Sequence, residues 1–466
     1  MYGRILTPIG RITVIKSLLI PKLNHLFISL PNPKKETISY LNKILFEFLW
    51  KSKIDKVKRS VITQDYSSGG LKMVDINNFI ISLKCSWIKR LTKSHKPWMD
   101  FLFTIYGNEF LQNLFDFGDS FVIECLHKVN NDFWKDVLNS WLCFIITYID
   151  HPKAKDNLLN SPVWYNSKIL IANKYVFIKT WYKNGVKVIQ DFYDENCNFL
   201  SYEEFKCKYN LKNICIMQYN SVKSAIFKFF KMSNIDRTSV QRNPNPCIPF
   251  FFQTIILHEK CTKIIYNVLN ENVVVPIAVT RWKTDLVDYN VEDLTVYDIF
   301  KICFKTTKDS SVQWLQFRIL HKILPVGYYL KKINIKNTDT CGFCKNNVET
   351  IIHVFISCEK IHTLWSELSL YIYRKTSERI GFNMSNIILG QLPLSFHNKV
   401  INFIILYMKQ YIFCCLMSNK TPCLIGFLYH LKLKYNIERY AAIQTGKLQY
   451  FENLWDSWKD ILAADI

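Results

Sequence analysis

The chain has 466 residues, too many for one ordinary hydrophobic core, so two to four domains are expected. Hydrophobic residues make up 49% of the chain and aromatic residues 15%, which excludes an intrinsically disordered protein. The net charge of +22 favours a polyanionic partner, with nucleic acid as the first choice and an anionic membrane as the second.

Apolar residues at helical spacing, separated by turn-forming residues, predict a series of helices along the chain. The expected elements, in order, are a helix over 11–30 that kinks or restarts at Pro21, a helix over 34–50, a polar loop over 51–60, a turn at 67–70, a helix capped by Asp75, a short hairpin within 168–178, a helix over 180–191, a helix opened by the capping box Ser201–Glu204, and helices over 314–324, 353–371, 398–418 and 451–462. The polar, Pro-containing stretch 236–246 is the clearest linker.

One stretch, 401–417, is apolar enough to suggest a membrane span. Lys409 and Gln410 lie at its middle, where charge costs most in a bilayer, so we expect a buried helix instead and no membrane partner. Residues 1–20 lack the features of a signal peptide, and fifteen cysteines in such a chain indicate a reducing compartment. The protein is therefore expected to be intracellular, in the nucleus or the cytoplasm or both, and not secreted.

Three cysteines and one histidine fall within eighteen residues of the C-terminal part: Cys341, Cys344, His353 and Cys358. The Cys-x-x-Cys pair can direct two thiolates at one ion from a tight turn, and Gly342 is expected to relieve the backbone there. A neutral imidazole and a third thiolate would complete a closed Cys3His site, which is typical of structural zinc. Ordinary buried cysteines are the alternative.

The spacing of the last two ligands also predicts a local irregularity. His353 and Cys358 are five positions apart, about 140° around a regular helix, so one straight helix does not aim both at the same ion. We therefore expect His353 on a helical turn that breaks or loosens before Cys358.

The N-terminal residues 1–60 hold twelve Lys and Arg residues against three acidic ones. Such a cluster binds a phosphate backbone without reading sequence, because it neutralises phosphates and releases counterions. A solvated surface is the alternative. The expected contacts with RNA or DNA are Arg11, Lys16, Lys22, Lys34, Lys35, Lys51, Lys53, Lys56, Lys58 and Arg59.

Motifs for catalysis are missing from the sequence. It contains neither a G-x4-G-K-[ST] phosphate loop nor a G-x-S-x-G nucleophile elbow. The segment nearest to a polymerase Tyr-x-Asp-Asp is YIDH at 148–151, which has a single aspartate. Because two-metal phosphoryl transfer needs paired carboxylates, the chain by itself is expected not to be an enzyme.

Several segments together resemble the C-terminal part of the reverse transcriptase of LINE-type, non-LTR retrotransposons. LTPIGRITVIKSLLIPKLNHLFISLPNP, FEFLW and GGLKMVDI are similar to its thumb, and 161–205 is similar to its connecting region. WLQFRILHKILPVGYYL, followed by CGFC, ETIIH, FISC and Trp365, resembles the reverse-transcriptase zinc-binding domain. Two departures stand out. The family's endonuclease and palm are expected upstream of Met1, and Val326-Gly327 replace a frequent Thr-Asn.

The pattern of expected elements predicts a mainly α, multi-domain helical protein with a minor β hairpin and a small zinc-stabilised module, and the resemblance gives names to its parts. The domains expected are a thumb-like domain (1–95), a connecting region with the hairpin (96–235), a linker (236–246), and a C-terminal helical domain (247–466) that contains the zinc module at about 314–372. It implies a nucleic-acid-binding fragment whose thumb grips the backbone, with structural Zn²⁺ and without polymerase activity. The alternative is a zinc-stabilised structural or interaction module without productive nucleic-acid binding.

Overall fold

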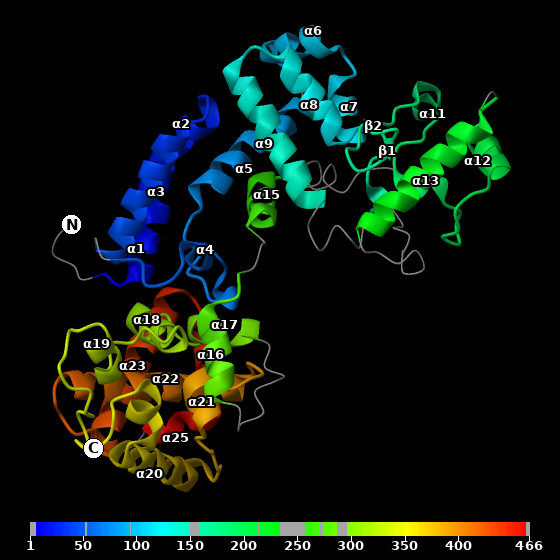
Figure 1. Cartoon of the computed structure of the whole chain (residues 1–466). Coiled ribbons are helices and arrows are strands. Elements are labelled where there is room, and N and C mark those ends of the chain that lie inside the picture. The colour runs from blue at the N-terminus through cyan, green and yellow to red at the C-terminus, as the bar shows by residue number, and fades with distance from the viewer. Residues whose placement is uncertain are drawn as a thin grey trace. The chain divides into compact units, whose positions relative to one another are not determined.

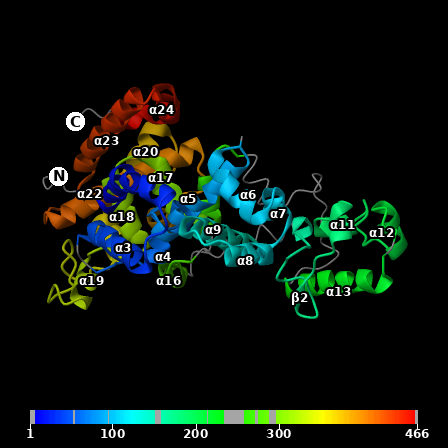
Figure 2. The ribbon, with the colours of Figure 1, turned by 90° about the horizontal axis from the view of Figure 1, so that it is seen from above.

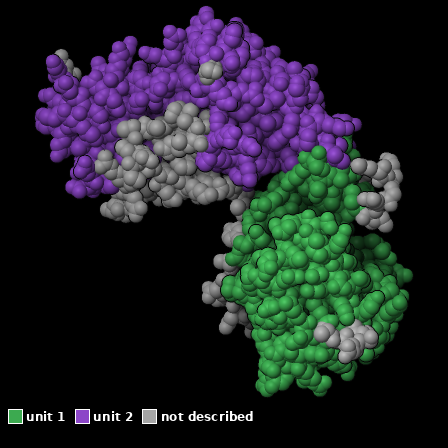
Figure 3. All heavy atoms as spheres, turned by 180° about the vertical axis from the view of Figure 1, so that it is seen from behind, with its two compact units in different colours: residues 1–17, 44–73, 273–466 green, residues 18–43, 74–272 purple. Residues whose placement is uncertain are grey.

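The computed structural model is mainly helical, as the sequence predicts, with one two-stranded hairpin (Figure 1). It describes residues 6–51, 54–93, 95–149, 158–212, 214–233, 258–270, 274–286 and 296–462. The chain divides into two compact units, coloured separately in Figure 3: unit 1 is made of residues 1–17, 44–73 and 273–466, and unit 2 of residues 18–43 and 74–272. The predicted linker 236–246 lies outside the described residues.

The elements of unit 2 are α2 (Ile20–Ser29), α5 (Ile76–Leu91), α6 (Asp100–Tyr106), α7 (Phe110–Asp116), α8 (Asp119–Lys128), α9 (Asp132–Ile149), β1 (Leu170–Ile171), β2 (Lys174–Tyr175), α11 (Lys179–Lys183), α12 (Tyr202–Lys208), α13 (Ile216–Met232) and α15 (Cys261–Leu269). One apolar core lies between α5, α7, α8, α9 and α15 and buries Phe110 and Trp141. A second core joins the hairpin region to α11, α12 and α13 around Trp164 and Trp181.

Local sequence signals decide where several of these elements begin and end. The Asp75 side chain accepts the backbone N–H of Asn78 at 3.0 Å, so it caps α5 as predicted. Ser201 and Glu204 form the predicted capping box at the start of α12. In contrast to these two caps, the predicted helix over 180–191 is wrong. The chain leaves α11 after five residues and turns at Gly185, whose φ of 100° favours glycine.

The β hairpin is confirmed within the predicted segment. Leu170 pairs with Tyr175 and Ile171 pairs with Lys174 in antiparallel register. The two residues between the strands both have positive φ, as a tight two-residue hairpin turn requires. The reversal therefore lies at residues 172–173, one position before the expected one.

The elements of unit 1 are α1 (Pro8–Val14), α4 (Arg59–Ile62), α16 (Ile277–Asp285), α17 (Val296–Thr306), α18 (Ser310–Leu320), α19 (Gly327–Lys332), α20 (Glu359–Thr376), α21 (Met384–Leu389), α22 (Phe396–Met417), α23 (Leu424–Gln444), α24 (Leu448–Trp455) and α25 (Lys459–Leu462). Helix α3 (Lys35–Trp50) crosses the division between the units, and a π-helical turn, Ile15–Leu19, joins α1 to α2. Pro21 stands in the first turn of α2, so the helix restarts there as expected. Figure 2 shows the same elements from above.

Helix α22 is the centre of unit 1, where it packs against α17, α18, α23 and α24. Its hydropathy and length would suit a membrane, but 72% of its most apolar window is buried inside the protein, as predicted. Lys409 at its middle is 1% exposed and donates to Gln316 Oε1 at 2.6 Å and to the Ile387 carbonyl at 2.7 Å. Burial lowers the pKa of Lys409 to about 7. A second helical stretch of comparable length and hydropathy among the described residues, Pro8–Ser29, is 22% buried by the same measure.

Unit 1 also contains a turn at residues 66–70, called the N-terminal turn. It contacts the C-terminal helices although it is more than 200 residues away from them in the sequence. Tyr66 stacks on Phe304 of α17 with ring centroids 3.8 Å apart, and the Gly69 carbonyl lies 2.9 Å from His321 Nε2. A Cβ on Gly70 would meet the Gln64 carbonyl oxygen at 2.1 Å, so the turn needs glycine there for space. Unit 1 thus joins residues expected in the thumb-like domain to residues expected in the C-terminal domain. The compact units cut across the boundaries at 95 and 247.

Candidate metal centre

The Cys-x-x-Cys pair lies on a tight reversal between two short extended segments. Thr340 and Val348 form an isolated antiparallel bridge, and the Cys341 N–H donates to the Asn347 carbonyl at 2.7 Å. The Phe343 N–H points at Cys341 Sγ at 3.4 Å. Lys345, directly after the pair, takes the left-handed conformation with φ of 61°. This turn places both thiols on its inner side, as two ligands of one ion require.

Gly342 serves the turn in a different way from the one predicted. It does not have a positive φ; instead, a Cβ there would lie 2.7 Å from Leu416 Cδ1 of α22. Its N–H donates to Glu349 Oε2 at 2.8 Å, and Glu349 Oε1 accepts the Gly327 N–H at 2.7 Å. Glu349 is 3% exposed, and sequence analysis did not single it out. This buried carboxylate holds the Cys-x-x-Cys turn to the start of α19.

The predicted irregularity between His353 and Cys358 is confirmed. Residues His353–Ser357 form a π-helical turn, and Cys358 is extended with ψ of 126° before α20 begins. The wider turn changes the angle between the two side chains, so both face the Cys-x-x-Cys pair. Trp365 Nε1 donates to the Phe355 carbonyl at 2.8 Å, which ties this π turn to α20.

The ligand atoms of Cys341, Cys344, His353 and Cys358 all lie within 4.8 Å of one another. His353 Nε2 is 3.4 Å from Cys344 Sγ, and its other ring nitrogen, Nδ1, is 3.4 Å from Ser357 Oγ. Zinc–sulfur bonds of about 2.3 Å place tetrahedral sulfurs about 3.8 Å apart, so a small contraction of this cluster would close it on an ion. Three thiolates and one imidazole are a donor set that suits zinc, with Ser357 orienting the imidazole.

The environment favours a thiolate at one of the cysteines even without an ion. At Cys344, burial acts to raise the pKa, but the backbone N–H groups of Asn346 and Asn347 and the His353 ring outweigh it and lower the pKa to about 6. Burial raises the pKa of Cys341 to about 11 and also raises the pKa of Cys358. A divalent cation would be needed to hold all three in the thiolate form.

The ten basic residues predicted to contact nucleic acid are divided between the two units. Arg11, Lys16, Lys51, Lys56, Lys58 and Arg59 belong to unit 1, and Lys22, Lys34 and Lys35 belong to unit 2. Lys53 lies outside the described residues. All the described ones except Arg11 are exposed. Arg59 is paired with Asp55 at 2.7 Å.

Arg11 has a structural position. Its guanidinium is 7% exposed and donates to the Leu49 carbonyl at 2.8 Å, at the end of α3, and to the Leu6 carbonyl at 2.8 Å. The last carbonyls of a helix lack partners within the helix, and a cation there is favourable. Arg11 therefore caps the C-terminal end of α3 and does not lie on the surface.

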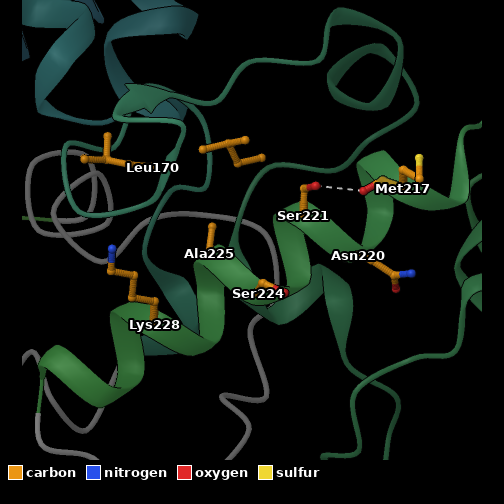
Figure 4. A pocket seen from close by; sticks show the side chains of 8 residues that line it. Leu170, Met217, Asn220, Ser221, Ser224, Ala225 and Lys228 are labelled. Atoms are coloured by element: carbon orange, nitrogen blue, oxygen red, sulfur yellow. Dashed lines mark hydrogen bonds between the residues drawn. The ribbon is translucent and has the colours of Figure 1, made fainter.

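A hollow of about 600 Å³ lies in unit 2 between β1 and α13 (Figure 4). Ser221 Oγ, on its wall, donates to the Met217 carbonyl at 2.8 Å. Among the described lining residues, Lys228 is the charged one, and none of them is a carboxylate, histidine or cysteine. The described part of the lining thus presents no set of groups suited to acid–base or nucleophilic chemistry.

A comparison with protein families agrees with the geometry of the cluster. A family model described as zinc-binding in reverse transcriptase matches residues 282–365. The match contains all four ligand residues and both Glu349 and Trp365, which brace them. Residues 282–365 of this chain are a reverse-transcriptase zinc-binding domain with a Cys341/Cys344/His353/Cys358 cluster.

Proposed function

We propose that the chain is a nucleic-acid-binding part of a LINE-type, non-LTR retrotransposon reverse transcriptase. The zinc-binding domain carries this proposal, because it is the region where sequence spacing, geometry and family comparison agree. The thumb-like and connecting assignments rest on the resemblance of the flanking segments. The protein binds the phosphate backbone of RNA or DNA, with little sequence preference.

The metal has a structural role in this proposal. Four protein ligands fill a tetrahedral site, so a bound Zn²⁺ would have no open position for a substrate or an activated water. Cys341 and Cys344 hold the ion from the hairpin-like turn, and His353 and Cys358 hold it from the π turn. The ion supplies a cross-link between these two segments, which no disulfide could supply in a reducing compartment.

Phosphate binding is assigned to the exposed lysines beside α4 in unit 1. Lys51, Lys56 and Lys58 are exposed and belong to the same compact unit as the zinc-binding domain. Lysine side chains on a loop can follow a phosphate path and release counterions without base recognition. The net charge of +22 adds long-range attraction to any polyanion.

The test is the salt dependence of binding to duplex and RNA–DNA hybrid. If roughly four cations neutralise phosphates, the logarithm of affinity falls with the logarithm of salt at a slope near −4. Changing Lys53, Lys56 and Lys58 together to Ala should weaken binding to all sequences alike and flatten that slope. The matched control is Lys174, Lys179 and Lys183 to Ala, three exposed lysines of unit 2. Equal losses in both variants would mean that only net charge matters.

We further propose that the chain by itself extends no primer. This follows from the missing paired carboxylates in its sequence. Primer extension on an RNA template by the purified chain, abolished by changing one of its own acidic residues, would contradict it. The second candidate function, a zinc-stabilised structural module, is favoured by the closed metal site. Binding that is absent or insensitive to salt would select it.

A further inference from the structure

Unit 1 has a groove of about 590 Å³ along one face of α20. Its floor is formed by buried apolar side chains, including Trp365, Ile380 and Ile387. Its rim is formed by His362, Leu370, Tyr373 and Arg379, which are exposed. We call this the α20 groove. Its volume is within the range of pockets that hold small planar ligands.

The α20 groove is physically joined to the metal centre. Ile356, one of its lining residues, belongs to the π turn that begins at His353 and directly precedes Cys358. Trp365 lies in the floor and donates its indole N–H to the Phe355 carbonyl of the same turn. The conformation that brings His353 to the metal site therefore also shapes one wall of the groove.

The rim and floor combine aromatic rings with a cation. The guanidinium of Arg379 lies 5.2 Å from the ring centroid of Tyr373, whose side chain is 41% exposed. The ring centroids of Trp365 and Phe382 are 4.9 Å apart. The described lining residues include no carboxylate, and the neighbouring Glu378 is paired with His397 at 3.0 Å. Such a site suits a flat ring attached to an anion, because the ring can stack while Arg379 attracts the charge.

We propose that the α20 groove holds an unpaired nucleobase of a single strand, stacked against Tyr373, with the adjoining phosphate near Arg379. The proposal rests on the proposed nucleic-acid function and adds a base-contacting site to its backbone-contacting lysines. Every nucleobase has a stacking face, so the site accepts RNA and DNA with little sequence preference. A paired base is excluded because its faces are covered by its neighbours in the duplex.

The experiment compares two labelled strands of equal length, one an oligothymidylate and the other a sugar–phosphate strand without bases. Both are titrated with the zinc-loaded full chain at constant salt. Tyr373→Ala should weaken thymidylate binding roughly tenfold and leave the abasic strand unchanged. Tyr373→Phe, which keeps the ring, should bind thymidylate like the parent protein. Tyr429→Ala, at a tyrosine 63% exposed on α23, is the matched control and should alter neither strand.

Four outcomes would overturn the site. Equal affinity of Tyr373→Ala and parent protein for thymidylate would mean that another ligand, such as a peptide, uses the groove. Equal losses on both strands would mean that Tyr373 acts on phosphate contacts or on folding. Salt-dependent duplex binding by a parent protein that does not distinguish thymidylate from the abasic strand would overturn this site alone. Failure to bind any strand or duplex would overturn the proposed function together with the site.

Discussion

The metal centre and the N-terminal basic segment, residues 11–59, were both predicted to bind charged partners, and the structure organises them very differently. The four ligand atoms of the metal centre converge to within 4.8 Å. The described basic residues of the N-terminal segment, 11–59, belong to two compact units. Arg11 is buried at the end of α3, Arg59 is ion-paired with Asp55, and the others are exposed. A site for one small ion must be built from a fixed geometry, whereas a surface for an extended polyanion needs only exposed charge.

This difference predicts which changes affect folding and which affect binding alone. In the metal centre, each ligand should be indispensable and its loss should unfold the local segment. In the N-terminal segment, the effect of a residue should depend on its burial.

Cys344→Ser should abolish the bound zinc, which is expected at about one equivalent per chain. Structural zinc contributes an apparent binding free energy of about 10–16 kcal/mol in small zinc domains, so the variant should melt at a clearly lower temperature. Metal analysis and thermal unfolding measure the two effects. Cys207→Ser, at an exposed cysteine of unit 2, is the control and should keep the parent metal content. Full zinc in Cys344→Ser would remove that residue from the ligand set.

The contact between His321 and the N-terminal turn should make stability depend on pH. Burial lowers the pKa of His321 to about 4, below the value near 6.5 of an unfolded chain. The unfolded state therefore binds the proton first. The stabilising contribution is fully present above about pH 6.5 and decreases as pH falls toward about 4.

Between about pH 7 and pH 4.5, the parent protein should lose about 2–3 kcal/mol more unfolding free energy than His321→Gln. The glutamine keeps a side-chain N–H for the Gly69 carbonyl and removes the titration. Urea unfolding at the two pH values measures the difference. Parallel losses in both proteins would show that the acid sensitivity comes from other groups, the metal ligands among them.

Arg11→Met should lower the free energy of unfolding by about 2 kcal/mol, because charge-assisted hydrogen bonds to three backbone carbonyls are lost. The slope of nucleic-acid affinity against salt should stay the same. Denaturant unfolding and a salt titration of the same sample check both statements. A flatter salt slope with unchanged stability would return Arg11 to the phosphate-binding residues.

The triple change of Lys53, Lys56 and Lys58 to Ala should have the smallest effect on folding. Surface substitutions usually alter stability by less than about 0.5 kcal/mol, so the melting temperature should barely move while the salt slope flattens. This variant is the counterpart of Arg11→Met. A large loss of stability would show that these lysines contribute to folding as well as to binding.

Much of the local structure could be predicted from the sequence because short-range chemistry decides it. Asp75 and Ser201 cap their helices through bonds that span three residues. The π turn before Cys358 follows from ligand spacing alone, since a regular helix cannot satisfy both ligands. The helix predicted over 180–191 is wrong for an equally local reason. Gly185 adopts a positive φ, and the apolar pattern outweighed that single residue in the prediction.

The braces of the metal centre could not be predicted in this way. Glu349 reaches Gly327, which is 22 residues away in the chain, and Gly342 is required by the approach of Leu416 from α22. Neither contact has a local signature in the sequence. The same is true of Arg11, whose basic side chain has the sequence appearance of a surface residue.

The helical class, the hairpin and the four residues of the Cys3His cluster could be predicted from the sequence alone, because periodicity, capping and residue spacing act over a few residues. The tertiary structure decided which charged groups are available. Arg11 and Lys409 are buried against backbone carbonyls, while Lys56 and Lys58 remain exposed. It also joined the turn at Gly69 to His321, 252 residues apart. Burial and long-range contact depend on how elements pack, and packing is a property of the whole chain rather than of any segment.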